Sequence, residues 1–110
     1  MIDWSRVLEL RNEVGVDDFE EVVDLFLEEV EGVIADLDPN ASASQLEQHL
    51  HFLKGSALSL GFADFSSMCQ EGERLSAGGE TEAIDLPRIV SGFEASKQVF
   101  QSELDARLRR

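Results

Sequence analysis

The apolar residues of this chain recur every three or four positions, the spacing that gives an α-helix one buried side. The pattern first runs over residues 3–14, which begin with an aspartate that can cap a helix, and Gly15 ends it. A longer run follows, and Asp17 with Glu20 three residues later has the sequence of a capping box at its start. This second helix should end before Pro39, because proline disfavours a helical conformation at the residue before it.

Two more helices are predicted in the middle of the chain. Ser44 and Glu47 repeat the capping-box pattern, and the helix that starts there should run to about Gly61. Its apolar residues follow one another at alternating steps of four and three: Leu46, Leu50, Leu53, Ala57 and Leu60. The next helix is expected over about residues 64–77, and the glycine pair at 78–79 breaks it.

The last predicted helix has a start signal and a charged end. Asp85 can cap it, and Pro87 fits its first turn, where a missing N–H costs no hydrogen bond of the helix. Its carboxyl end carries Arg107, Arg109 and Arg110, and basic side chains are favoured at this end of the helix dipole.

Together these segments predict an all-α fold, an up-and-down antiparallel four-helix bundle with a short additional N-terminal helix. Residues 38–43 and 78–84 are short enough to be turns between antiparallel neighbours. Two prolines in 110 residues and a hydrophobic content of 43% agree with a globular helical protein. We expect one domain over residues 1–110.

The net charge limits the classes of partner. Nine basic and 23 acidic residues give a formal charge of −14, which repels the phosphates of nucleic acids and anionic lipid headgroups. We therefore expect neither a nucleic acid nor a membrane as a partner. The acidic residues are spread over several predicted helices, as on a solvated surface, although they could also steer a basic partner toward the protein.

Cysteine usage and the amino-terminal sequence predict a cytoplasmic protein. The single cysteine, Cys69, leaves no internal disulfide and reads as small core filling within a helix. The first residues lack the basic region and apolar run of a secretory signal. No stretch approaches the roughly 20 apolar residues of a membrane span.

Residues 51–61 read His-Phe-Leu-Lys-Gly-Ser-Ala-Leu-Ser-Leu-Gly and hold the most informative chemistry of the chain. On a helix, His51 points away from the buried stripe, so its ring should reach solvent at the edge of the bundle. Neutral imidazole is a nucleophile near physiological pH. Lys54, three residues later on the same side, can stabilise a phosphoryl group attached to the ring. His49 points in roughly the opposite direction, so we expect no metal site shared by the two histidines.

Gly55 follows His51 by four residues and lies on the same side of the predicted helix. Glycine within a helix costs about 1 kcal/mol relative to alanine, which suggests that the space is needed. Helical side chains lean toward the amino terminus, so a side chain at this position would lie over the turn that carries His51. Its absence opens the imidazole to a bulky reactant. The alternative is that another helix packs closely against Gly55.

This stretch resembles the signature of histidine-containing phosphotransfer (HPt) domains, in which His-x-Leu-Lys-Gly-Ser is followed by Leu-Gly. The preceding acidic helix and the helix around residues 69–73 also look like this family, so the resemblance covers essentially the whole chain. It implies that His51 accepts the phosphoryl group, with Lys54 as the associated cation and Gly55 as the small neighbour. It further implies that Glu73 bonds the far nitrogen of the ring and orients it. Gly72 is unusual within the fourth helix and predicts local loosening there.

The resemblance implies a carrier without kinase activity of its own. His51 would accept a phosphoryl group from an aspartate of a receiver domain and relay it to another response regulator receiver. The chain would need no cofactor, and the magnesium ion would come with the receiver. The implied partners are response regulator receiver domains and a hybrid or cognate sensor histidine kinase, and we expect a monomer. By position, the candidate docking residues are Leu58, Phe62, Phe19 and Val22.

Two other functions are open at this point. The chain could be a helical adaptor or sequestering module that docks receiver domains without carrying phosphate. It could also be a detached phosphoacceptor domain of a chemotaxis-type kinase, labelled directly by an ATP-binding domain.

Overall fold

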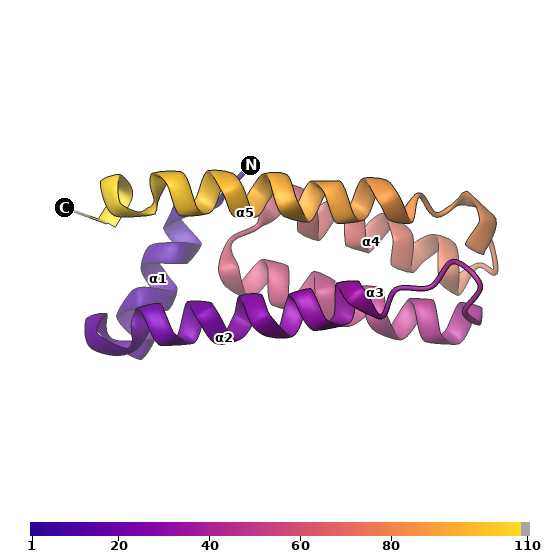
Figure 1. Ribbon diagram of the computed structural model, residues 1–110, viewed down its shortest axis with the longest axis horizontal. Coiled ribbons are helices and arrows are strands. Elements are labelled where there is room, and N and C mark those ends of the chain that lie inside the picture. The colour runs from indigo at the N-terminus through magenta and orange to yellow at the C-terminus, as the bar shows by residue number, and fades with distance from the viewer. Residues whose placement is uncertain (109–110) are drawn as a thin grey trace.

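The computed structural model describes residues 1–108, and five α-helices build them into an antiparallel bundle (Figure 1). The expectation of an all-α, up-and-down four-helix bundle with a short extra helix at the amino terminus is confirmed. The elements are α1 (Trp4–Val14), α2 (Val16–Ala35), α3 (Ala43–Leu60), α4 (Ala63–Ala77), the 3₁₀ turn η1 (Thr81–Ala83) and α5 (Leu86–Leu108). Arg109 and Arg110, part of the expected basic end, lie outside the described residues.

The described residues form an elongated body of 46 × 20 × 19 Å, and α1 lies across one end of the four long helices. In the view of Figure 1, α2 and α5 lie in front and α3 and α4 lie behind them. The ring of Trp4 stacks on Phe100 with 5.8 Å between the ring centroids, so α1 is fixed to α5 at this end. Within residues 1–108, no helix combines the length and the apolar character needed to cross a membrane.

Small buried residues bring α3 and α4 close together. Their inward sides carry residues with little or no side chain: Ser56, Ala57, Ser66, Cys69, Gly72 and Ser76. The hydroxyl of Ser76 also donates a hydrogen bond of 2.5 Å to the carbonyl of Ala43. The expectation that Gly72 loosens α4 is therefore wrong, because the glycine is buried where the helices meet and lets them approach.

The predicted start of α2 is wrong, because the N-cap is Gly15, two residues before Asp17. Gly15 ends α1 at φ +90° and is followed immediately by the first residue of α2, Val16. No side chain caps α2, so Asp17 and Glu20 do not form the expected capping box. The turn is too tight to leave room for one. Asp17 and Asp18 instead lie in the first turn, where the helix dipole favours negative charge.

The predicted start of α3 is also displaced. Ser42, not Ser44, is the N-cap, and its hydroxyl accepts a hydrogen bond of 3.1 Å from the backbone N–H of Gln45. Ser42 and Gln45 have the same capping-box spacing as Ser44 and Glu47, so the sequence contained two equivalent signals. The caps predicted at Asp3 and Asp85 are confirmed by hydrogen bonds to backbone N–H groups three residues later.

The amino terminus holds the turn between α3 and α4 in place. Gly61 ends α3 at φ +80°, and its carbonyl accepts a hydrogen bond of 2.7 Å from the N–H of Asp3. Ile2 and Phe62 form an isolated antiparallel bridge next to it. A Cβ at Gly61 would lie 2.6 Å from the carbonyl oxygen of Asp3, so both the backbone conformation and the space require glycine. The carboxyl end of α3 is thus anchored.

Candidate functional site

α3 presents His51 to solvent. The side chain is 69% exposed, as its spacing from the buried stripe predicts. The neighbouring residue on the inward side, Leu50, is fully buried, and Leu53 is too, so the turn of helix that carries His51 is fixed by the core. The imidazole therefore projects from a rigid support into open solvent.

Glu73 on α4 meets this histidine. Its Oε2 lies 2.6 Å from Nδ1 of His51, and its Oε1 lies 2.7 Å from Nζ of Lys54. One carboxylate thus joins the imidazole and the ammonium group. The close approach of the helices sets this geometry, because Gly72 packs against Leu50 and the next residues along the two helices are Glu73 and His51.

The charge of Glu73 determines how His51 is protonated. The pKa of Glu73 is lowered, mainly by the hydrogen bond from Lys54 and to a smaller extent by the bond to His51, while partial burial opposes this effect. The group is therefore a carboxylate at neutral pH and can only accept hydrogen bonds. Nδ1 of His51 must then carry the proton and donate the hydrogen bond to Glu73, and Nε2 of the neutral ring keeps its lone pair.

Lys54 lies in the site, but its ammonium group is occupied. With 26% of its side chain exposed, it bonds the carboxylate of Glu73. Spacing alone placed Lys54 on the same side as His51 and did not reveal this ion pair. In the structure, the positive charge of Lys54 acts first on Glu73 and reaches the imidazole through it.

Gly55 faces open space. A Cβ built on it would have no atom of another residue within 4 Å, apart from its own helix backbone. The alternative explanation, that another helix packs against Gly55, is therefore wrong. That packing role belongs to Gly72, and Gly55 leaves a gap on the surface one turn from His51.

The Hpt domain family model matches residues 21–109, which is nearly the whole chain. The protein belongs to the Hpt domain family. No curated protein and no solved structure gave a match. Hpt domains are helical bundles that carry phosphoryl groups on histidine in two-component phosphorelays, and they work with receiver and kinase proteins. They are carriers and not catalysts. In this Hpt domain, α1 precedes the matched residues.

Two of the four candidate docking residues of the Hpt domain are buried. Phe62 has no exposed surface, because its backbone pairs with Ile2 and its ring packs 5.3 Å from that of Phe100. Phe19 is 5% exposed and faces α5. The prediction that these two side chains dock a receiver domain is therefore wrong, because neither is at the surface. Phe62 lies beyond the end of α3, where the chain turns inward at Gly61, so it does not continue the exposed side of that helix.

The other candidates remain at the surface. Leu58 is 56% exposed and follows His51 by seven residues, so it lies two turns along the same side of α3. Val22 on α2 is partly exposed. Other exposed apolar side chains were not among the candidates, and Leu25 and Phe52 are two of them. The sequence could have indicated their exposure, because each is an apolar residue outside the buried stripe of its helix.

The remaining titratable candidates stay outside this site. His49 is partly buried, and its Nδ1 has no hydrogen-bond partner. Cys69 is fully buried, and desolvation raises the pKa of its thiol to about 12, so it is a neutral core side chain. Among residues 1–108, no group of three or more His, Cys, Asp and Glu side chains is placed to hold a metal ion.

Proposed function

We propose that this Hpt domain is a phosphorelay carrier that uses His51 as its phosphoacceptor. The phosphoryl group comes from the aspartate of one receiver domain and goes to the aspartate of another. The observation that carries the proposal is the contact of 2.6 Å between Nδ1 of His51 and Oε2 of Glu73 on an imidazole that is 69% exposed. This contact leaves Nε2 as the nucleophilic nitrogen and leaves it accessible.

The transfer step follows from that arrangement. The lone pair of Nε2 attacks the phosphorus of the aspartyl phosphate, an N–P bond forms, and the bond from phosphorus to the aspartate oxygen breaks. The aspartate leaves as a carboxylate. Nδ1 keeps its proton, so the ring of the phosphohistidine gains positive charge, and Glu73 stands opposite that charge. Transfer to the second receiver reverses these changes.

Lys54 and Gly55 support the same reaction in different ways. Lys54 holds Glu73 ionised and aimed at the ring, and its positive charge favours the approach of the phosphoryl oxygens. Gly55 leaves open space beside the ring, which a receiver domain needs in order to bring its aspartyl phosphate up to Nε2. The magnesium ion would be held by the receiver and would neutralise the charge of the transferring phosphoryl group, the role that such ions have in other phosphoryl transfers.

Receiver docking would use the exposed apolar side chains near the histidine. Leu58 lies on the same side of α3 as His51, and Val22 on α2 is partly exposed. The partners are receiver domains and a hybrid or cognate sensor histidine kinase. The proposal places the protein in the cytoplasm as a monomer, and mutual repulsion at a net charge of −14 supports the latter.

The decisive test is transfer from a phosphorylated receiver domain to wild-type protein and to His51→Gln. We expect an acid-labile, base-stable label on the wild type alone, with equal helicity of the two proteins by circular dichroism. A His49→Gln variant is the matched control and should be labelled normally. Label that persists in His51→Gln would contradict the assignment of His51.

The same assay separates the two other functions. A docking module without phosphate transfer would bind receivers and acquire no label from any of them. A phosphoacceptor domain of a chemotaxis-type kinase would be labelled from ATP by a kinase domain with no receiver present. We expect labelling only when a phosphorylated receiver is included.

A further inference from the structure

A second feature of the surface is a groove between α2 and α5. Its volume is about 330 Å³, and it runs along α2 from Val16 to Leu27 and along α5 from Phe100 to Leu108. Twelve residues of α2 correspond to about 16 Å of helix, or roughly three turns. The groove is therefore long enough for side chains from successive turns of a bound helix. Its volume lies at the lower end of the range for ligand sites, about 300–1,000 Å³.

The groove has an apolar floor and an apolar opening. Phe19, Val23 and Phe100 form the floor and are at most 5% exposed. Leu104 and Val16 lie at the opening, and Val16 is 65% exposed, although valine gains by burial. An occupant with apolar side chains would cover this surface.

The edges of the groove are acidic. Glu20 and Asp24 line it from α2, and Asp105 lines it from α5, while among residues 1–108 its lining includes no lysine or arginine. Three carboxylates beside an apolar floor favour a positively charged, partly apolar occupant and repel an anionic one. A second copy of this chain, with its net charge of −14, is a poor match for the same reason.

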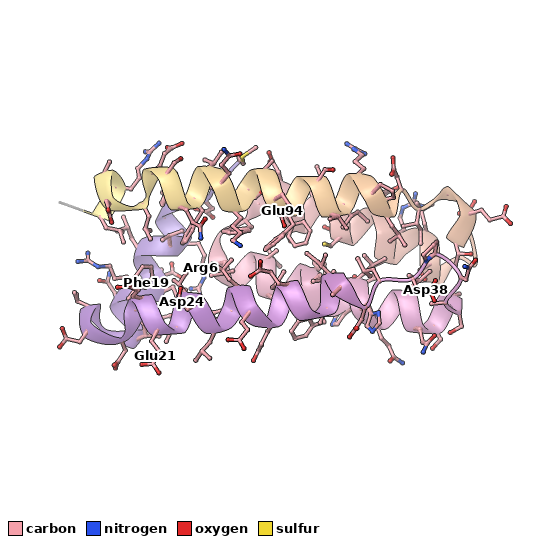
Figure 2. The ribbon with its side chains drawn as sticks, viewed as in Figure 1. Arg6, Phe19, Glu21, Asp24, Asp38 and Glu94 are labelled. Carbon is pink, nitrogen blue, oxygen red and sulfur yellow. The ribbon has the colours of Figure 1, made fainter. Side chains whose placement is uncertain are left out.

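The groove lies away from His51. Figure 1 shows α2 and α5 together at the front of the bundle, whereas the ion pairs of His51 and Lys54 with Glu73 join α3 and α4 behind them. Figure 2 shows Phe19 and Asp24 on α2, on the side toward α5 and near the end that α1 crosses. An occupant of the groove would leave the imidazole accessible.

We propose that the α2–α5 groove binds an amphipathic basic helix of a partner protein. Leucine-like side chains at positions i, i+3 or i+4 and i+7 of that helix enter the apolar floor, and lysine or arginine side chains on its flanks pair with Glu20, Asp24 and Asp105. Such a partner would hold the carrier while His51 exchanges phosphoryl groups on the other side. The inference goes beyond the proposed function and does not depend on it.

The test uses a peptide of about 15 residues, long enough for a helix, with leucines at these spacings and lysines elsewhere. A second peptide of the same composition has an order that spreads the leucines around the helix. Titration into ¹⁵N-labelled protein should shift backbone amide signals of residues 16–27 and 100–108 and leave residues 51–58 unchanged. The reordered peptide should bind at least about tenfold more weakly, because it cannot place its leucines together in the groove.

Matched variants locate the charge and the apolar contact. Asp24→Lys with Asp105→Lys should weaken binding about tenfold, while Glu28→Lys with Glu82→Lys, the same charge change outside the groove, should weaken it less than about threefold. Val16→Ser should weaken binding and Leu25→Ser should not. Equal effects of the two charge pairs, equal binding of the two peptides, or signal shifts centred on residues 51–58 would each overturn the proposal. His51→Gln should bind the peptide like the wild type, whatever the outcome of the transfer assay.

Discussion

Gly72 on α4 lies against Leu50 on α3, so closely that a Cβ on the glycine would be 3.0 Å from Cδ1 of the leucine. The same Cβ would be 3.3 Å from Cδ1 of Ile89 on α5. Three helices therefore meet at a position where a methyl group would be crowded unless Leu50 or Ile89 shifts by a few tenths of an ångström. His51 and Glu73 are the next residues along α3 and α4, so this contact also sets the distance between the phosphoacceptor candidate and its carboxylate partner.

Gly72→Ala should destabilise the protein. Alanine gains about 1 kcal/mol over glycine in a helix, but overpacking a core site costs about 1–3 kcal/mol, and both neighbours here are buried. We expect a net loss of about 1 kcal/mol in the free energy of unfolding, measured by urea denaturation with an unchanged m-value. A more stable variant would show that Leu50 and Ile89 can move aside.

Gly55→Ala is the matched substitution at a glycine that faces open space. No atom opposes the new methyl group, so the gain in helix propensity should appear undiminished, as an increase of about 0.5–1 kcal/mol in the free energy of unfolding. Opposite signs at Gly55 and Gly72 are the expected result. If both substitutions change the free energy of unfolding in the same direction, the contacts around the two glycines do not determine their effects.

Gly55→Gln should separate folding from transfer. A long side chain at this position leans over the turn that carries His51 and occupies the space that a receiver domain needs. We expect normal helicity and at least about tenfold slower labelling from a phosphorylated receiver, with Gly55→Ala close to the wild type. Normal labelling of Gly55→Gln would remove the access role of this glycine.

The helices and the positions of His51, Lys54 and Gly55 could be predicted because they depend on local spacing. Buried stripes of period 3.6 define the bundle, and residues three and four apart share a side of a helix. Helix starts were less certain, since Ser42 and Ser44 offer equivalent capping signals and tertiary packing selects between them. Glu73 was found through family resemblance and not through its own sequence neighbourhood.

Features that depend on two helices meeting could not be read from spacing. The burial of Phe62 follows from the turn at Gly61 and from pairing with Ile2, which is 60 residues earlier in the chain. The packing role of Gly72 and the bond between Lys54 and Glu73 likewise require the register of α3 on α4. A contact between two separate elements leaves no signal in the local sequence of either one.

Leu58→Ser should weaken receiver docking without changing the chemistry at His51. The side chain is 56% exposed, so its replacement removes an apolar contact and leaves the core intact. We expect the receiver concentration at half-maximal transfer rate to rise about threefold or more, with an unchanged maximal rate. Val16→Ser, at the groove between α2 and α5, is the control and should leave transfer unaffected. A fall in the maximal rate of Leu58→Ser would indicate a role in the reaction itself.

The stability of the protein should depend on pH through Glu73. Its folded-state pKa is lower than the ordinary 4.5, so the unfolded chain binds a proton more readily than the folded one. The stabilisation is complete at pH values above the ordinary carboxyl pKa and is lost as the pH falls through the lower folded value. Wild type should therefore exceed Glu73→Gln in stability by a constant amount near neutral pH and converge toward it as the solution becomes acidic. A stability difference that does not change with pH would contradict the ion pairing of Glu73.

Glu73→Ala should allow the neutral ring of His51 to adopt both of its tautomers. The bond of 2.6 Å to Oε2 holds the proton on Nδ1, and without it the neutral ring can exchange between its two tautomers. In ¹⁵N spectra of the imidazole, the wild type should show a protonated Nδ1 and a free Nε2, while Glu73→Ala should show averaged signals. Transfer from a receiver should slow by about tenfold or more.

Glu73→Gln distinguishes orientation from charge at the same position. Its amide oxygen can still accept a hydrogen bond from the Nδ1–H group, so the tautomer should be kept. The neutral amide cannot balance the positive charge of the phosphorylated ring or hold Lys54 as an ion pair. We expect a transfer rate between those of the wild type and Glu73→Ala. If Glu73→Gln transfers as slowly as Glu73→Ala while keeping the wild-type tautomer, the carboxylate acts through its charge and the orientation of the ring contributes little. Wild-type rates in both variants would remove Glu73 from the mechanism.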